Sequence, residues 1–205
     1  MVVAVVPHDP RWAEMFAVEA GRVAAALGVD VAAVHHIGST AIPGIYAKPI
    51  LDLLVEAADL DEVDRRAGAM EALGYETMGE FGIAGRRYFR KDDAAGVRTH
   101  HVHLFLSGSP QVERHLAFRD FLRRRDDWAQ KYSELKRRLA AEHRDDAERY
   151  MDGKHELIQE IDRQAARWRT RFLAGCGSPI FRGCEARSGN RASPVARLPT
   201  RRVSR

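Results

Sequence analysis

Hydrophobic residues near the start of the chain follow first a helical and then a strand-like pattern. Asp9-Pro10 has the order of a helix start, an N-cap aspartate before a proline at the first helical position. Apolar residues then recur at helical spacing up to a stop at Gly28, namely Trp12, Met15, Phe16, Val23 and Leu27. Val31 to Ile37 and Ile50 to Val55 are predicted strands, and the second is apolar enough to be central in a sheet.

The middle of the chain predicts one more helix and a β-hairpin. The helix starts at Asp59 or Asp61, runs to Leu73 and is closed by Gly74, and a short strand follows at 75–78. Segments 87–91 and 99–106 have strand character and flank a turn at 92–96, which is the pattern of a hairpin.

From residue 109 onward the pattern is helical throughout. Three helices are marked by apolar and aromatic residues: Leu116, Phe118, Phe121 and Leu122; Trp128, Tyr132, Leu135 and Leu139; Tyr150, Met151, Leu157, Ile158, Ile161 and Trp168. The predicted fold class is therefore α+β, a small mixed β-sheet flanked by helices with a helical C-terminal half. We expect residues 1–170 to form this domain and residues 171–205 to form a tail.

The positive charge of the chain comes from that tail. Residues 171–205 hold eight arginines and one acid, a formal charge of +7, so of the total of +4 residues 1–170 carry −3. Arginine, glycine, serine and proline dominate the tail, a composition typical of a disordered segment. The alternative is an arm that contacts nucleic acid weakly. We expect no nucleic-acid partner for the rest of the chain.

Cysteine use and hydropathy predict a cytoplasmic protein with no membrane partner. The only cysteines, Cys176 and Cys184, lie in the last thirty residues, so the core is free of cysteine, which fits a reducing compartment. The chain has no run of eighteen apolar residues, and its start lacks the charged-then-apolar pattern of an export signal.

Candidate chemistry begins with an aspartate in the predicted central strand. Asp52 needs a partner, because an ionised group among apolar neighbours is costly. Leu54 stands one pleat later, where a two-metal site would need a second carboxylate, so Asp52 could anchor a single Mg²⁺ with help from substrate phosphates. The alternative is a structural carboxylate that caps the turn at Gly38-Ser39-Thr40 by accepting backbone N–H bonds.

Two histidines in the predicted hairpin form a second candidate. His101 and His103 project from the same face of a strand, a spacing that lets two imidazoles meet one metal ion or one phosphate. If this strand neighbours that of Asp52, the three residues form a mixed nitrogen and oxygen metal site. The alternative is a pair of ordinary, internally hydrogen-bonded histidines.

Basic residues next to these motifs could hold phosphate. Lys48 follows the glycine turn, and Arg90 lies in the predicted hairpin. Lys154 stands four residues after Tyr150, so Tyr150 and Lys154 share a helix face. Tyr150 and Lys154 could contact a base and a phosphate, or could simply pack, whereas for the equally spaced Tyr132 and Lys136 packing is favoured. The chain has no Walker loop, dinucleotide fingerprint, serine-hydrolase elbow or catalytic cysteine in its body.

These motifs resemble a known family. The segment His36 to Gly44 with Ala47 to Asp52 strongly resembles the GrpB (UPF0157) family, and His8 to Trp12, His101 to Leu104, Phe118 to Arg123, Tyr132 with Lys136, and Tyr150 with Lys154 fit it in order. The resemblance implies the nucleotidyltransferase fold superfamily typified by DNA polymerase beta. In active members of that superfamily a Gly-Ser turn, here Gly38-Ser39, holds nucleotide phosphates, and Asp52 matches the first aspartate of an Asp-x-Asp strand that binds Mg²⁺. GrpB-like members fused to dephospho-coenzyme A kinase imply a link to nucleotide or coenzyme A metabolism.

Three functional hypotheses follow. The leading one is a protein that binds a nucleoside triphosphate or related phosphorylated ligand at Gly38, Ser39, Thr40, Lys48, Arg90, Tyr150 and Lys154, with Mg²⁺ or another divalent metal on Asp52, His101 and His103. Such a protein could transfer a nucleotidyl group to an unknown acceptor, with Asp52 as the catalytic residue. The alternatives are a non-catalytic nucleotide- or coenzyme-sensing module and a metal-dependent hydrolase that uses the histidines and Asp52.

Overall fold

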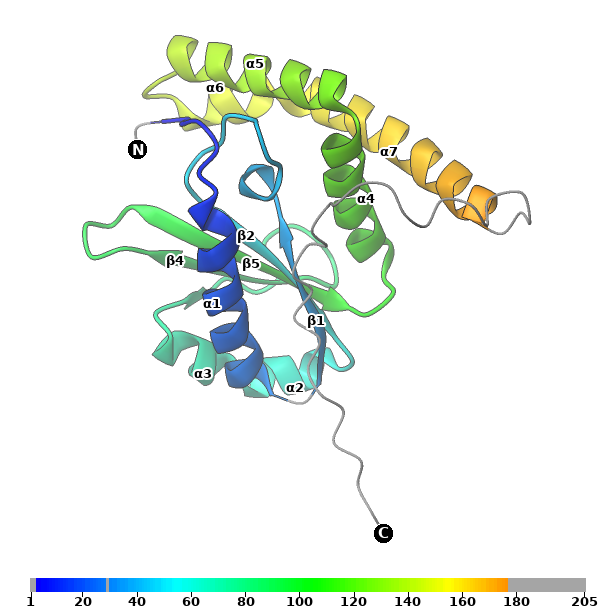
Figure 1. The fold of residues 1–205 in the computed structure, drawn as a ribbon. Coiled ribbons are helices and arrows are strands. Elements are labelled where there is room, and N and C mark those ends of the chain that lie inside the picture. The colour runs from blue at the N-terminus through cyan, green and yellow to red at the C-terminus, as the bar shows by residue number, and fades with distance from the viewer. Residues whose placement is uncertain (1–2, 29, 177–205) are drawn as a thin grey trace. The chain divides into compact units, whose positions relative to one another are not determined.

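The protein is described by a computed structural model that covers residues 3–28 and 30–176 (Figure 1). Its centre is a five-stranded mixed sheet with the strand order β1-β2-β5-β4-β3. The strands are β1 (Val31–Ile37), β2 (Leu51–Ala57), β3 (Glu76–Thr77), β4 (Arg87–Asp92) and β5 (Arg98–Leu106). The helices are α1 (Arg11–Leu27), α2 (Leu60–Arg65), α3 (Ala67–Ala72), α4 (Pro110–Arg124), α5 (Asp126–Glu142), α6 (Ala147–Asp152) and α7 (His155–Cys176), and a 3₁₀ turn spans Ser39–Ala41. The predicted α+β class with a small mixed sheet is confirmed.

The chain divides into two compact units. Among the described residues, the sheet unit comprises 9–41 and 49–113, and the helical unit comprises 3–8, 42–48 and 114–176. Strand β2 is the best-buried strand of the sheet unit, because it pairs with β1 in antiparallel and with β5 in parallel orientation. Its residues Leu53, Leu54 and Val55 are fully buried. The apolar run that predicted a central strand therefore marks a strand with a partner on each side, as β5 and β4 also have.

Helix α1 covers one face of the sheet. The ring of Phe16 stacks on His36 of β1 at 4.7 Å, and both side chains are buried. The carboxylate of Glu19, 4 % exposed, accepts hydrogen bonds at 3.0 Å from the Tyr75 hydroxyl and the Lys91 ammonium. These contacts connect α1 to Tyr75 and to Lys91 of β4. Asp52, His101 and His103, polar residues of β2 and β5 that do not face α1, lie on the opposite face of the sheet.

The helical unit has its own core. Its main apolar cluster joins the 42–48 segment, α4, α5 and α7, and consists of Ile42, Ile45, Ala117, Phe121, Leu122, Ala129, Tyr132, Ile161 and Ala165. The amide of Tyr46 donates to the Ser133 hydroxyl at 2.9 Å, which fixes the 42–48 segment on α5. None of the helices in residues 3–28 and 30–176 combines the length and the hydropathy needed to span a bilayer.

Two of the predicted helices are wrong in their extent. The helix expected to end at Leu73 is interrupted at Arg66, whose ψ of 6° leaves the helical region, and Gly68 just beyond gives that stretch a low helix propensity. The last predicted helix is interrupted between α6 and α7, at Gly153 and Lys154. A Cβ at Gly153 would lie 2.6 Å from Leu139 Cδ2, so a larger residue there would require the Leu139 side chain to shift. Helix α7 continues to Cys176, so the first residues of the tail expected from residue 171 are helical. Residues 177–205 of that tail lie outside the described residues.

Candidate functional site

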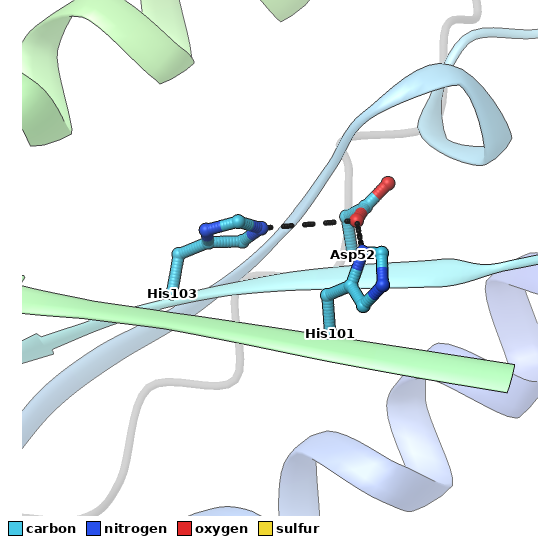
Figure 2. Close-up of side chains that lie close together, drawn as sticks. All are labelled: Asp52, His101 and His103. Atoms are coloured by element: carbon cyan, nitrogen blue, oxygen red, sulfur yellow. Dashed lines mark hydrogen bonds and ion pairs between the residues drawn. The ribbon is translucent and has the colours of Figure 1, made fainter. Parts of the chain in front are cut away.

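The parallel pairing of β2 and β5 brings three polar side chains together. Asp52 lies opposite His101 in the register, and Leu54 lies opposite His103, so all four share one face of the sheet. His101 Nδ1 lies 2.9 Å and His103 Nε2 3.8 Å from Asp52 Oδ1 (Figure 2). We call these three residues the Asp52 cluster. Each offers one ligand atom, the three atoms lie within 4.8 Å of one another, and no other such group of three exists in the described part of the chain.

Asp52 is held as a carboxylate. Burial opposes its ionisation, but the hydrogen bond from His101 and the electrostatic interaction with the nearby His103 outweigh burial and hold the pKa of Asp52 below its usual range. Because an ionised carboxylate only accepts hydrogen bonds, Nδ1 of His101 must carry the proton that it shares with Asp52. The partner that the sequence analysis demanded for Asp52 is therefore a pair of imidazoles. Nε2 of His101 does not take part in this hydrogen bond.

The glycine turn is built around this carboxylate. Gly38 has φ +69°, and a Cβ at this position would lie 2.1 Å from Asp52 Oδ2. Both the backbone conformation and the close approach of Asp52 thus require glycine here. Ser39 and Thr40 follow in the 3₁₀ turn, beside the end of β1.

Thr40 has an internal role in this turn. Its hydroxyl donates to the carbonyl of Ile50 at 3.1 Å and lies 3.0 Å from His36 Nε2, which therefore carries a proton and donates to it. Thr40 is 2 % exposed, and its hydroxyl stabilises the turn through these two contacts. A contact of Thr40 with a ligand stays a prediction. His35, the neighbour of His36, lies on the face of the Asp52 cluster and pairs with Glu56 at 2.7 Å.

Arg90 reaches the same face but is engaged by an acid. It lies opposite His101 in the β4–β5 register, and its guanidinium binds both carboxylate oxygens of Glu76 at 2.5 and 3.0 Å. The pair is partly exposed, so a phosphate could replace Glu76 as the partner of Arg90 at little cost.

Tyr88 belongs to this face and was missed by the sequence analysis. It lies opposite His103 in the β4–β5 register, and its ring centroid is 5.2 Å from that of His103 and 5.7 Å from that of His101. The available signal was its place in the hairpin, two residues before Arg90, because alternate residues of one strand share a face.

The other predicted residues gather in the helical unit. Lys48 Nζ and Lys154 Nζ lie 4.4 and 4.2 Å from the centroid of the Tyr150 ring, which is 1 % exposed. Two cations on one aromatic ring make cation–π pairs, and burial lowers the pKa of Lys48. Lys48, Tyr150 and Lys154, all predicted from the sequence as ligand-binding residues, thus lie in contact with one another through the Tyr150 ring.

Lys136 extends this group of lysines. Its ammonium donates to the carbonyl of Tyr46 and lies 4.4 Å from the Tyr132 ring, and the residue is 2 % exposed. Burial and the nearby charge of Lys154 lower the pKa of Lys136 to about 7. The packing predicted for Tyr132 and Lys136 is thus what the structure shows, with a consequence for protonation that spacing could not reveal.

Comparison with known proteins adds the family. The family described as GrpB protein matches residues 2–164. The chain belongs to the GrpB family. It is 44 % identical over 167 residues to the UPF0157 protein YqkA of Bacillus subtilis, covering 82 % of this chain and 48 % of YqkA, so it spans about half of that relative. The crystal structure of conserved protein GrpB from Enterococcus faecalis has a TM-score of 0.76 and 41 % identity, over 80 % of this chain and 98 % of that one. A dephospho-CoA kinase of Mycobacterium bovis is 29 % identical over 189 residues, covering 80 % of this chain and 46 % of the kinase.

Proposed function

We propose that this GrpB-family protein binds a phosphorylated ligand of the nucleoside triphosphate class together with one divalent metal held by the Asp52 cluster. The observation that carries the proposal is the convergence of one carboxylate and two imidazoles, with ligand atoms within 4.8 Å of one another. A carboxylate kept ionised among partly buried neighbours is the form that binds a cation.

The donor set favours a particular class of metal. One carboxylate and two imidazoles suit zinc, manganese, iron or cobalt, whereas Mg²⁺ prefers oxygen ligands. Leu54 is fully buried where a second carboxylate would stand, so the cluster supports one ion and not a two-metal pair. Such an ion would polarise a phosphoryl oxygen or activate a water molecule. Mg²⁺ bound mainly by ligand phosphates is the alternative.

Separate observations support a phosphorylated ligand. In the helical unit, Lys48 and Lys154 bring two positive charges to one ring, an arrangement to which a phosphate group is electrostatically complementary. The name of one relative, dephospho-CoA kinase, is compatible with such a ligand.

Two reactions fit the cluster, and their products differ. In nucleotidyl transfer an acceptor attacks the α-phosphate and pyrophosphate leaves, with Arg90 available to neutralise charge. In hydrolysis water is the nucleophile, and an ion held by Asp52, His101 and His103 would favour this second candidate by lowering the pKa of a water molecule bound to it. Identification of the released group, pyrophosphate or orthophosphate, separates the two. Binding without turnover would indicate a sensing module.

Metal analysis and nucleotide titration test the proposal. We expect bound zinc, manganese, iron or cobalt near one ion per chain, and an at least about tenfold loss of metal affinity in His101→Gln and in His103→Gln. His155→Gln, an exposed histidine at the start of α7, is the matched control and should keep wild-type affinity. We also expect ATP, CTP or GTP to bind in calorimetry with Mn²⁺. Equal metal affinity in all four proteins, or no binding of any nucleotide by the wild type, would overturn the proposal.

A further inference from the structure

The loop before β4 holds an exposed aromatic ring in an unfavourable backbone conformation. Phe81 has φ +43°, and it is the non-glycine residue of the described chain that adopts positive φ. A bulky residue in this region is strained, and such strain persists only where the surroundings impose it. Phe81 is nevertheless 59 % exposed, so its ring gains little from burial.

Hydrogen bonds clamp this loop on both sides of Phe81. The guanidinium of Arg86, a residue 6 % exposed, donates to the carbonyls of Glu80 at 3.1 Å and of Phe81 at 2.7 Å. The carboxylate of Glu80 accepts from the amide of Gly85 at 2.6 Å. The Phe81 ring is therefore presented by a rigid support and not by a mobile loop tip.

One residue, Tyr88, separates the Phe81 ring from the Asp52 cluster. Phe81 and Tyr88 have ring centroids 5.5 Å apart with planes 30° from parallel, and Tyr88 in turn lies 5.2 Å from His103. Arg86 lies over the Tyr88 ring at 4.7 Å from its centroid. A continuous line of flat side chains thus leads from the candidate metal ligands to an exposed aromatic surface.

We propose that Phe81, supported by Tyr88, is a stacking platform for the nucleobase of the ligand, and so decides that a nucleotide binds in preference to an inorganic polyphosphate. The inference rests on the proposed function, because it assumes a phosphorylated ligand at the Asp52 cluster. A planar π-surface is what an exposed, immobilised ring recognises, and stacking on aromatic side chains tolerates any base. Pre-organisation of the ring explains why the strain is retained, since no ordering of the loop is needed on binding.

Substitution by glycine separates this role from a structural one. Glycine adopts positive φ freely, so Phe81→Gly removes the ring and also relieves the backbone strain. We expect its affinity for ATP with Mn²⁺ to fall about 5- to 150-fold, the range for one stacked base, while tripolyphosphate binding and the melting temperature stay the same or rise. Phe81→Trp should keep ATP affinity. Val97→Ala, an exposed apolar residue at the tip of the β4–β5 hairpin, is the control and should change neither ligand.

The outcomes are distinguishable. Wild type that binds tripolyphosphate as tightly as ATP, or Phe81→Gly that binds ATP like wild type, overturns the platform and leaves the proposed function standing. Equal weakening of both ligands in Phe81→Gly, or a lower melting temperature, shows a structural role for Phe81 and also overturns the platform. Absence of binding of both ligands to wild type removes the proposed function and the platform together.

Discussion

Replacement of the buried Lys136 by methionine should change how stability depends on pH. Methionine keeps the length of the side chain and removes its only titrating group. In the folded protein the pKa of Lys136 is lowered to about 7 by burial and by the charge of Lys154, from an ordinary value of 10.5. Between these two values the unfolded chain binds more protons than the folded one, so the free energy of unfolding rises with pH.

The magnitude follows from the two pKa values. At pH 7 the folded lysine is about half protonated, whereas the unfolded lysine stays almost fully protonated up to about pH 9. The Lys136 contribution to the free energy of unfolding therefore increases by about 2 kcal/mol from pH 7 to pH 9, on the order of 4–8 °C in melting temperature for a chain of this size. Lys136→Met should lose this increase. It should also lose the hydrogen bond to the Tyr46 carbonyl, at a cost that does not vary with pH.

Urea unfolding at pH 7, 8 and 9, followed by tryptophan fluorescence, measures the effect. Trp128 and Trp168 pack against the core of the helical unit and report on the part of the chain that holds Lys136. Lys131→Met is the matched control, because Lys131 lies on the same helix and is exposed. Equal pH slopes for wild type and Lys136→Met would refute the reasoning, since they would mean that Lys136 titrates alike in the folded and unfolded states.

Three further substitutions test the sheet unit and the turn. Gly38→Ala should lower the free energy of unfolding in urea by about 2 kcal/mol more than Gly44→Ala does. Both positions have positive φ, but only at Gly38 would a Cβ lie against Asp52. Equal losses of unfolding free energy would show that this contact relaxes freely. The lowered pKa of Asp52 stabilises the folded protein above about pH 4, and Asp52→Asn should lose this stabilisation. The difference in free energy of unfolding between wild type and Asp52→Asn should therefore shrink as the pH falls further. A difference that grows in acid would contradict this prediction. Glu19→Gln keeps an oxygen acceptor but removes the negative charge that pairs with Lys91, so it should lower the free energy of unfolding by about 2–4 kcal/mol in thermal or urea unfolding. Glu76→Gln, at an exposed ion pair, should cost little. Similar losses for both would show that the burial of Glu19 does not matter.

Local sequence patterns predict much of the secondary structure. The helix after Pro10, its stop at Gly28, the strand Val31–Ile37 and the hairpin strands all lie where periodicity and turn residues predict them, because each depends on neighbours within a few positions. The two missed helix breaks, at Arg66 and Gly153, depend on features that periodicity does not carry. At Gly153 the close neighbour is Leu139, which lies on another helix.

The sequence by itself determined the residue types of the site and which of them alternate on one strand. It selected Asp52, His101 and His103, because an aspartate in an apolar strand and two alternating histidines are chemically conspicuous. Only the tertiary structure decided that β5 pairs with β2 in parallel and in the register that sets Asp52 opposite His101, 49 positions away in the chain. Register, the place of Tyr88 beside the histidines, and the burial that shifts the pKa of Lys136 all depend on packing between distant segments, and packing is a property of the folded chain that no local pattern contains.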